Sequence, residues 1–259
     1  MACGSRLPAP RGAAASTHIL KPAIAAVERS VINEAFCMAL AKVMGLQVAD
    51  TEILMAGDQQ ILLVRRYDRC KDANDQWLRL HQEDFCQALG VPPDLKYQNE
   101  GGPDLQACFA LLRRATKPSA PEVIRLLDAV VFNALIGNHD AHAKNFSLLY
   151  GSRGATLAPL YDLLSTAVYP TLTTKMAMKL GSKYSFAEVQ VRHWELFAVA
   201  AGLSKAQTRK RLVRMAEQLP SSARRLQTKS SYRDHALIER IACLIEQRCE
   251  LSLSRFNAD

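Results

Sequence analysis

The sequence predicts an α+β protein in which a small, strand-containing first part precedes a larger, mainly helical remainder. Two patterns support this prediction. Up to about residue 70, short apolar runs are separated by turn-forming residues, whereas later runs are longer and carry apolar residues at helical spacing. Apolar residues make up 49% of the 259 residues, which is typical of a globular chain with a sizeable core.

The first part combines short strands with one long helix. We expect residues 1–16, which are rich in Ala, Pro, Gly and Arg, to be frayed. In residues 26–44 the apolar positions recur with the period of a helix, and Gly45 is expected to end it. Gly57-Asp58 is a hairpin signal between two strands. The strands expected up to residue 80 are 17–21, 51–56, 60–65 and 77–80.

Helical patterns dominate the remainder. Pro121 stands at the first turn of a long apolar stretch that ends at Ile136, as suits a helix buried at the centre of a lobe. The expected helices are residues 81–90, 104–115, 121–136, 186–201, 204–218 and 232–253, with strands at 146–150 and 156–160. We therefore expect residues 17–70 to form one domain and residues 71–259 another.

Charge and cysteine content restrict the functional class. The net charge of +8 favours acidic partners such as nucleotides, nucleic acid or an acidic protein face, although a generally basic protein gives the same value. The seven cysteines are scattered without a C-x-x-C pair, so we expect free thiols in a reducing, cytoplasmic environment. No apolar run reaches the ~18 residues of a spanning helix or resembles a signal peptide, so we expect no membrane association.

Three residues with recognisable spacing suggest the chemistry. Asp140 is followed five positions later by Asn145 and about twenty residues further by Asp162. Protein kinases use a D-x-x-x-x-N loop and a later aspartate in the same order. Asp140 would orient an acceptor serine or threonine hydroxyl, and the other two would hold Mg²⁺ at the phosphates of a nucleotide. The alternative is that each residue only caps a loop. The set predicts a nucleotide-dependent kinase.

Lys21 is the candidate phosphate-contacting lysine. It ends the first expected strand, ahead of the long helix, where kinases place the lysine that contacts the α- and β-phosphates. Glu34 on that helix would pair with it, and Glu28, nearer the start of the helix, is the competing partner. A solvated surface lysine is the alternative interpretation.

Two histidines leave a second interpretation open. His139 and His142 flank Asp140 as H-x-x-H, a pattern that also suits a metal hydrolase. Zinc sites on helices use histidines four positions apart, and no second cluster of His, Cys or Glu lies nearby in the sequence. We therefore expect His142 and Lys144 to be phosphate contacts or hydrogen-bond donors in the catalytic loop. Lys144 is the better phosphate candidate because its charge is permanent.

The late part of the chain carries a dense group of basic residues. A basic helix can contact phosphates or an acidic protein, and a solvated helix face is the alternative. The members of this group are Lys205, Arg209, Lys210, Arg211, Arg214, Arg224, Arg225 and Lys229.

Several segments together resemble the HipA family of bacterial serine/threonine kinases, the toxins of type II toxin–antitoxin systems. The resemblance implies a two-lobed protein-kinase-like fold with a small mixed N-lobe, a mainly helical C-lobe, and the use of ATP and Mg²⁺. The segments are 17–22 (THILKP), 80–87 (LHQEDFCQ), 95–97 (LKY), 101–103 (GGP), 138–147 (NHDAHAKNFS) and 157–165 (LAPLYDLLS).

The resemblance also assigns roles to single residues. Asp140 matches the catalytic aspartate of the family, and Lys21 matches its ATP-contacting lysine. Asn145 and Asp162 match its Mg²⁺ ligands. Residues 65–69 (RRYDR) match the lobe hinge, where the backbone around Arg65 and Tyr67 would meet the adenine. Arg65 departs from the acidic residue often found there.

The family's partners are part of what the resemblance implies. Its kinases phosphorylate a translation component, usually an aminoacyl-tRNA synthetase, and a HipB-like helix-turn-helix antitoxin neutralises the toxin on DNA. The family carries a Gly-rich phosphate loop ahead of the lysine, whereas only Gly4 and Gly12 precede Lys21 here. We therefore expect a fragment, a short homologue, or a chain completed by another polypeptide. The rival interpretation is a catalytically weak remnant that binds an antitoxin–DNA complex.

Overall fold

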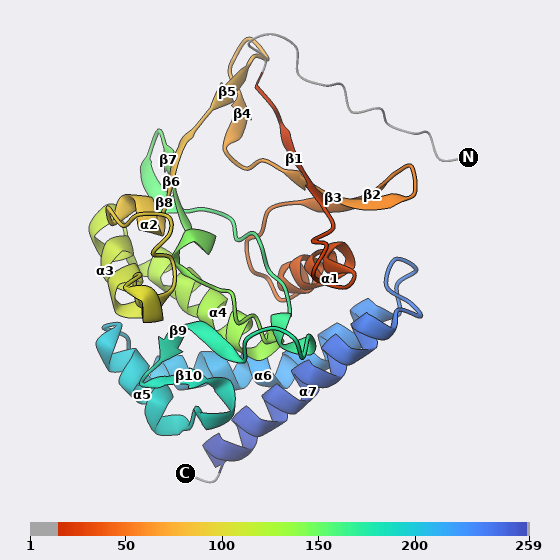
Figure 1. The fold of residues 1–259 in the computed structure, drawn as a ribbon. Coiled ribbons are helices and arrows are strands. Elements are labelled where there is room, and N and C mark those ends of the chain that lie inside the picture. The colour runs from red at the N-terminus through yellow and green to blue at the C-terminus, as the bar shows by residue number, and fades with distance from the viewer. Residues whose placement is uncertain (1–14, 258–259) are drawn as a thin grey trace.

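Small antiparallel sheets and long helices make up the two lobes (Figure 1). The computed structural model describes residues 15–257, so most of the predicted frayed N-terminus lies outside the described residues. The strands are β1 (His18–Pro22), β2 (Thr51–Ala56), β3 (Gln59–Arg65), β4 (Arg69–Lys71), β5 (Trp77–Arg79), β6 (His81–Asp84), β7 (Ser147–Gly151), β8 (Gly154–Leu157), β9 (Lys175–Leu180) and β10 (Lys183–Ser185). The α-helices are α1 (Ser30–Val43), α2 (Phe85–Ala88), α3 (Leu105–Ala115), α4 (Ala120–Ile136), α5 (Val191–Ala200), α6 (Lys205–Gln227) and α7 (Ala236–Asn257).

The N-lobe is a three-stranded sheet packed on α1. Its strand order is β1-β3-β2, with both neighbours antiparallel to β3. The predicted hairpin is confirmed, and Gly57 at its turn has φ 61°, a left-handed conformation that glycine adopts without strain. The predicted helix at 26–44 begins later than expected, at Ser30, because Arg29 at its N-cap is itself left-handed with φ 50°.

A second sheet has the order β6-β7-β8, and its strand β8 packs against α3 and α4. The expectation of a helix from residue 81 was wrong for its first turn. His81 to Asp84 form β6, which pairs with β7, and the helix α2 begins only at Phe85. The Asp84 side chain accepts from the backbone N–H of Gln87 and so caps α2. Asp84 is therefore both the last residue of β6 and the N-cap of α2.

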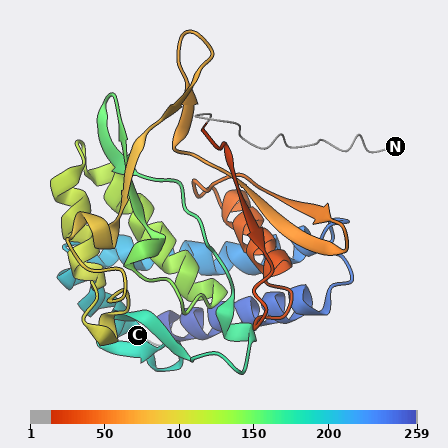
Figure 2. The same cartoon turned by 45° about the horizontal axis from the view of Figure 1, so that its top comes forward.

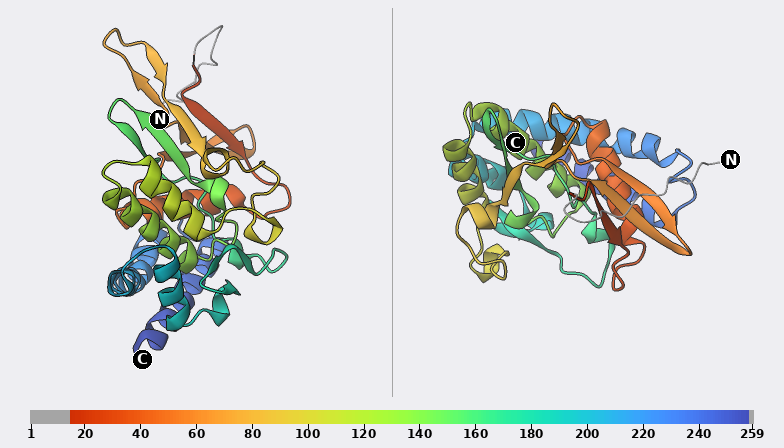
Figure 3. Two further views of the ribbon diagram at one scale, coloured as in Figure 1. Left: turned by 90° about the vertical axis from the view of Figure 1, so that its left-hand side faces the viewer. Right: turned by 90° about the horizontal axis from the view of Figure 1, so that it is seen from above.

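The hairpin of β4 and β5 projects beyond the rest of the molecule (Figures 1 and 3). Residues 77–79 confirm the predicted strand, whereas β4 was not expected. This hairpin crosses residue 70, and the division of the chain into domains at that residue stays a prediction.

The helices of the C-lobe enclose α4. Large apolar side chains of α4, including Leu126, Leu127 and Phe132, are fully buried, and burial of each contributes about 1.5–3 kcal/mol. Figure 2 shows α6 and α7 running side by side, and both pack against α4. The predicted α3, α4, α5 and α7 are present with shifted ends. The short 3₁₀-helices are η1 (Gln98–Glu100), η2 (Ala143–Asn145), η3 (Thr166–Val168) and η4 (Phe186–Glu188).

The described residues contain free cysteines and no membrane-spanning helix. The six cysteines within the described residues are free thiols, and four of them are buried. Among residues 15–257, no helix has both the length and the apolar character needed to cross a bilayer.

Candidate active site

Lys21 connects the two lobes at the centre of the site. Its Nζ donates to Glu34 Oε1 at 2.6 Å and to Asp162 Oδ1 at 2.7 Å. Lys21 lies on β1, Glu34 on α1, and Asp162 in the segment after β8. Glu34 is therefore the partner of Lys21, whereas the competing Glu28 pairs with Arg240 at 3.0 Å.

Burial and charge oppose one another at this contact. Burial lowers the pKa of Lys21, but attraction to Glu34 and Asp162 outweighs it and the pKa is raised. Burial raises the pKa of Glu34 to about 7, although the neighbouring Lys21 acts in the opposite direction. Lys21 therefore remains a cation between the two carboxylates, while burial disfavours the charged form of Glu34.

Asp162 and Asn145 lie side by side. Asn145 Nδ2 donates to Asp162 Oδ2 at 2.7 Å, and Asn145 Oδ1 accepts from the backbone N–H of His142 at 3.1 Å. Asp162 has φ 58°, and aspartate adopts this left-handed conformation more readily than most residues. Both side chains carry oxygen atoms, the ligands that Mg²⁺ prefers. The pair could therefore hold Mg²⁺.

Asp140 stands apart from this pair and carries its own contacts. Tyr97 Oη donates to Asp140 Oδ1 at 2.7 Å, and the same oxygen lies 3.9 Å from His142 Nε2. The Tyr97 ring meets the His142 ring edge-on, with centroids 5.3 Å apart. The Asp140 side chain is still 48% exposed, so one face of its carboxylate remains open to a ligand.

The loop that carries Asp140 is fixed at its start. Gly137 ends α4 with φ 74°, and a Cβ there would come within 2.8 Å of Ala167 Cβ. The N–H of His139 donates to Thr166 Oγ1 at 2.7 Å. Asn138 Nδ2 donates to Asn133 Oδ1 at 2.9 Å. These contacts hold the backbone of the loop in place without involving Asp140.

Two hollows meet at Asp162. The larger has a volume of about 450 Å³ and is lined by Lys21, Glu34 and Lys144 among others. The smaller has a volume of about 320 Å³ and contains Asp140 and Tyr97. Asp162 lines both hollows. A ligand in one hollow and a ligand in the other would therefore meet at this carboxylate.

The structure places most of the predicted site residues around these hollows. The larger one is lined by Lys21, Glu34, Arg65, Tyr67, Lys144 and Asp162. Asn145 does not line this hollow but donates a hydrogen bond to Asp162, which does. His142 does not line it and lies buried on the side of Asp140. Burial lowers the pKa of His142, so the ring is neutral at pH 7.

His139 also makes a polar contact within the chain. Its Nδ1 lies 3.0 Å from the backbone oxygen of Thr173, and burial lowers its pKa. Within residues 15–257, no group of three or more His, Cys, Asp or Glu side chains is arranged to hold a metal ion.

The predicted hinge is held by an aspartate between two arginines. Asp68 is buried and accepts from Arg66 at 2.8 and 3.0 Å and from Arg69 at 2.5 Å. Burial raises the pKa of Asp68, but the arginine contacts outweigh burial and lower it. The Tyr67 ring stacks on Tyr161, with centroids 6.1 Å apart. The backbone around Tyr67 is thereby fixed at the edge of the larger hollow.

The sequence analysis did not single out two polar residues of the hollows. Tyr97 contacts Asp140 in the smaller hollow, and Gln82 lines the larger one. Gln82 Oε1 is buried without a hydrogen-bond partner among the described residues, so it is available to a ligand. Both residues lie in segments that carry the HipA resemblance, which was the one sequence signal for them.

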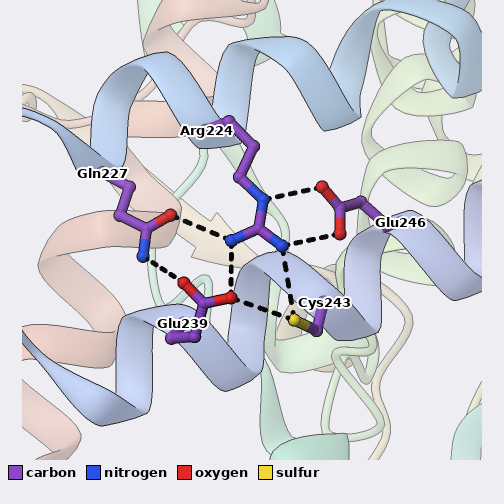
Figure 4. Close-up of polar contacts among 5 residues, drawn as sticks. All are labelled: Arg224, Gln227, Glu239, Cys243 and Glu246. Carbon is purple, nitrogen blue, oxygen red and sulfur yellow. Dashed lines mark hydrogen bonds and ion pairs between the residues drawn. The ribbon is translucent and has the colours of Figure 1, made fainter.

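Several members of the late basic group are engaged in contacts within the chain. Arg211 lies 3.0 Å from Asp128, and Lys205 lies 3.2 Å from Glu195. Arg224 contacts two glutamates and Cys243 between α6 and α7 (Figure 4). These residues therefore do not form one uncommitted surface for phosphates.

The sequence matches a known protein family. The family model of the HipA-like C-terminal domain matches residues 4–223, which is most of the chain. The chain belongs to the HipA family.

Two relatives of this HipA-family chain illustrate the match. The protein Y4mE of Sinorhizobium fredii, named as a kinase, is 46% identical over 92% of this chain and 57% of its own length. The serine/threonine-protein kinase toxin HipA of Shewanella oneidensis is 31% identical over 82% of this chain and 51% of its own length. The chain thus spans about half the length of these relatives.

Solved structures confirm the two-lobed kinase-like fold of this HipA-family chain. The Shewanella oneidensis complex of HipA, HipB and operator DNA contains a chain with a TM-score of 0.85 and 27% identity, covering 94% of this chain and 60% of that one. The Helicobacter pylori kinase CtkA has a TM-score of 0.56 at 12% identity, covering 92% and 86%, and shows similarity of the fold alone.

Proposed function

We propose that the chain is a HipA-like kinase that transfers the γ-phosphate of ATP to a serine or threonine of a protein. One observation carries the proposal: Asp162 lies between two hollows, bonded to Lys21 in the larger one and next to the hollow that contains Asp140. A kinase needs this geometry, because its two substrates react at a shared boundary.

The larger hollow would hold the nucleotide. The backbone around Arg65 and Tyr67 would meet the adenine, while Lys21 and Lys144 would contact phosphates. Glu34 would hold Lys21 in position. Asn145 and Asp162 fit Mg²⁺ because both offer oxygen ligands next to the place of the phosphates. Bound Mg²⁺ would supply positive charge that neutralises the transferring phosphoryl group.

The smaller hollow would hold the acceptor. The acceptor oxygen forms the new P–O bond as the bond from the γ-phosphorus to ADP breaks. Asp140 would orient the acceptor hydroxyl and accept its proton, since its carboxylate has an open face. Arginine and lysine are absent from the described lining of this hollow, so the acceptor meets no phosphate-binding side chain there.

The partners belong to the same proposal. A HipB-like antitoxin and, through it, DNA are supported by the named HipA–HipB–DNA complex. An aminoacyl-tRNA synthetase as the phosphorylated protein, and a cytoplasmic location, are supported by the family resemblance. Failure of all phosphoryl transfer with intact antitoxin binding would favour the rival function, a catalytically weak binding module.

The test is radiolabel transfer from ATP to a panel of purified bacterial aminoacyl-tRNA synthetases. We expect Asp140→Asn to lower transfer by about a hundredfold or more while leaving ATP binding intact, since general-base contributions are ~10²–10⁴. Asp162→Asn should lower both transfer and Mg²⁺-dependent ATP binding. Asp58→Asn is the matched control, because Asp58 is an exposed residue of the β2–β3 turn. Equal transfer by wild type and Asp140→Asn would remove Asp140 from the reaction.

A further inference from the structure

The hollow that contains Asp140 has an aliphatic side. Ile24 and Val27, in the connection between β1 and α1, face the same space as Leu164 and Leu172, which follow Asp162 in the chain. Ile24 is 52% exposed, so an apolar surface lies open there. None of these four residues is needed to orient a hydroxyl or to bind a nucleotide.

The two walls of the hollow are tied together. Tyr169 Oη donates to the backbone oxygen of Glu28 at 2.8 Å, beside Val27. The backbone N–H of Leu172 donates to the oxygen of Tyr169 at 3.1 Å. The connection from β1 to α1 is also held, because the N–H of Ile24 donates to Ser30 Oγ at 2.8 Å. The space between the walls is therefore preformed and does not depend on a bound ligand.

The size of the hollow suits a side chain. Its volume of about 320 Å³ is about ten times the ~30 Å³ that one water molecule occupies in the liquid. An aliphatic side chain that fills such a space removes apolar surface from water, both its own and that of the walls. An acidic side chain would instead meet Asp140 and Asp162 and be repelled.

On the basis of the proposed function, we propose that this hollow selects the protein substrate. It takes an aliphatic side chain (Leu, Ile, Met or Val) adjacent to the phosphorylated serine or threonine. The hydroxyl lies at Asp140 and the neighbouring side chain between Ile24 and Leu172. The substrate class is then a serine or threonine next to an aliphatic residue.

The test compares peptides with a central serine and Leu, Ala, Lys or Asp at each neighbouring position. Transfer from ATP is measured, and binding of the fluorescent peptides to the wild-type chain is measured separately without nucleotide. We expect one neighbouring position at which Leu exceeds Ala by about tenfold and Asp by more, since one methylene in an apolar pocket is worth ~10-fold or more. Preference for Lys over Leu at both positions, or no preference in either measurement, would overturn the inference.

Variants in the walls of the hollow test whether the hollow causes the preference for Leu. Ile24→Glu should abolish the preference for Leu and create one for Lys, because it places a carboxylate in the wall. Leu196→Glu is the control, since Leu196 is 54% exposed on α5, outside the hollow. Leu172→Ser should reduce the preference without reversing it, which provides a second variant should Ile24→Glu fold poorly. A preference for Leu that is unchanged in both wall variants would contradict the inference.

The two proposals fail separately. If the chain binds the peptides selectively but transfers no phosphoryl group, the proposed kinase activity is contradicted and the proposed pocket is not. Phosphoryl transfer with no preference for the neighbouring residue in either transfer or binding would contradict the proposed pocket but leave the proposed kinase activity standing.

Discussion

At the scale of single residues, the contact between Tyr97 and Asp140 gives the site a feature that spacing alone does not reveal. Tyr97 Oη donates to Asp140 Oδ1 at 2.7 Å. Burial and the neighbouring Asp140 raise the pKa of Tyr97, so the phenol remains a donor at any working pH. The hydrogen bond therefore restricts the orientation of a carboxylate that is otherwise half exposed.

Tyr97→Phe tests whether Tyr97 positions Asp140. The variant keeps the ring against His142 and removes only the O–H, so the fold should be retained. We expect kcat to fall about tenfold, as ~1.4 kcal/mol of positioning is lost, while the KM for ATP stays unchanged. Steady-state kinetics measures both.

Tyr150→Phe is the control for Tyr97→Phe. The Tyr150 hydroxyl donates to Glu83 at 2.6 Å, and neither residue lines the two hollows. An unchanged or higher kcat in Tyr97→Phe would mean that the phenol merely occupies the position of the acceptor hydroxyl.

The sequence could indicate Asp140, Asn145 and Asp162 because one loop and the strands after it bring them together. Lys21 was found from its place at the end of a strand, ahead of a helix. The contact of Tyr97 with Asp140 joins residues 43 positions apart. Such a contact has no local pattern, since it depends on how the segment after α2 lies across the catalytic loop.

At the scale of elements, tertiary packing decides where the sequence and the structure differ. The expected helix 204–218 stops short of Pro220, a residue type that usually breaks a helix. In the structure α6 continues through Pro220 to Gln227. Residues beyond the proline, including Ala223 and Leu226, are buried in the core, and this burial outweighs the loss of one backbone hydrogen bond. Local propensity could not show that packing.

The two longest helices are joined by a polar network. Arg224 on α6 donates to Glu246 at 2.6 and 2.7 Å and to Glu239 at 2.7 Å, both on α7 (Figure 4). Gln227 donates to the other oxygen of Glu239 at 2.6 Å. The network is partly exposed, so screening by water limits its contribution to stability.

Arg224→Ala should destabilise the protein modestly at neutral pH. We expect a loss of about 1 kcal/mol, equivalent to roughly 2–4 °C in Tm for a chain of this size. Hydrogen bonds from Gln227 and Arg224 lower the pKa of Glu239 to about 2. The stabilisation is then complete above its unfolded pKa of ~4.3 and is lost as the pH falls through about 2.

Thermal melts of both proteins at several pH values measure this effect. The difference between wild type and Arg224→Ala should be constant from pH 8 to pH 6 and shrink below about pH 4. Arg225→Ala is the control, because the only hydrogen bond of the Arg225 side chain within the described residues goes to Ser222. A difference that grows on acidification would contradict the assigned charge state.

At the scale of the whole molecule, α1 binds the N-lobe to the C-lobe. Asn33 on α1 is fully buried and donates to the backbone oxygen of Ser165 at 2.9 Å. Its Oδ1 accepts from the N–H of Ser165 at 2.8 Å. Tyr232 Oη also reaches across, donating to the oxygen of Ala35 at 3.2 Å. One asparagine therefore satisfies two backbone groups of the segment that carries Asp162.

Lys21 belongs to the N-lobe and Asp162 to the C-lobe. The contacts of Asn33 with Ser165 therefore also fix the distance between Lys21 and Asp162. The two-lobed fold followed from the family resemblance. The lobe contact could not be predicted, since Asn33 and Ser165 are 132 residues apart in sequence.

Asn33→Ala should therefore weaken both the fold and the nucleotide site. The substitution leaves buried backbone groups of Ser165 without partners, at a cost of about 2–4 kcal/mol. We also expect a weaker affinity for Mg·ATP, because Lys21 and Asp162 lose their fixed separation. Urea denaturation measures the first effect, and calorimetric titration at 10 °C, where the variant is folded, measures the second.

Asn99→Ala is the exposed control and should lie within ~0.5 kcal/mol of wild type. A destabilised Asn33→Ala protein with unchanged ATP affinity would show that the lobes hold the nucleotide site independently of this junction.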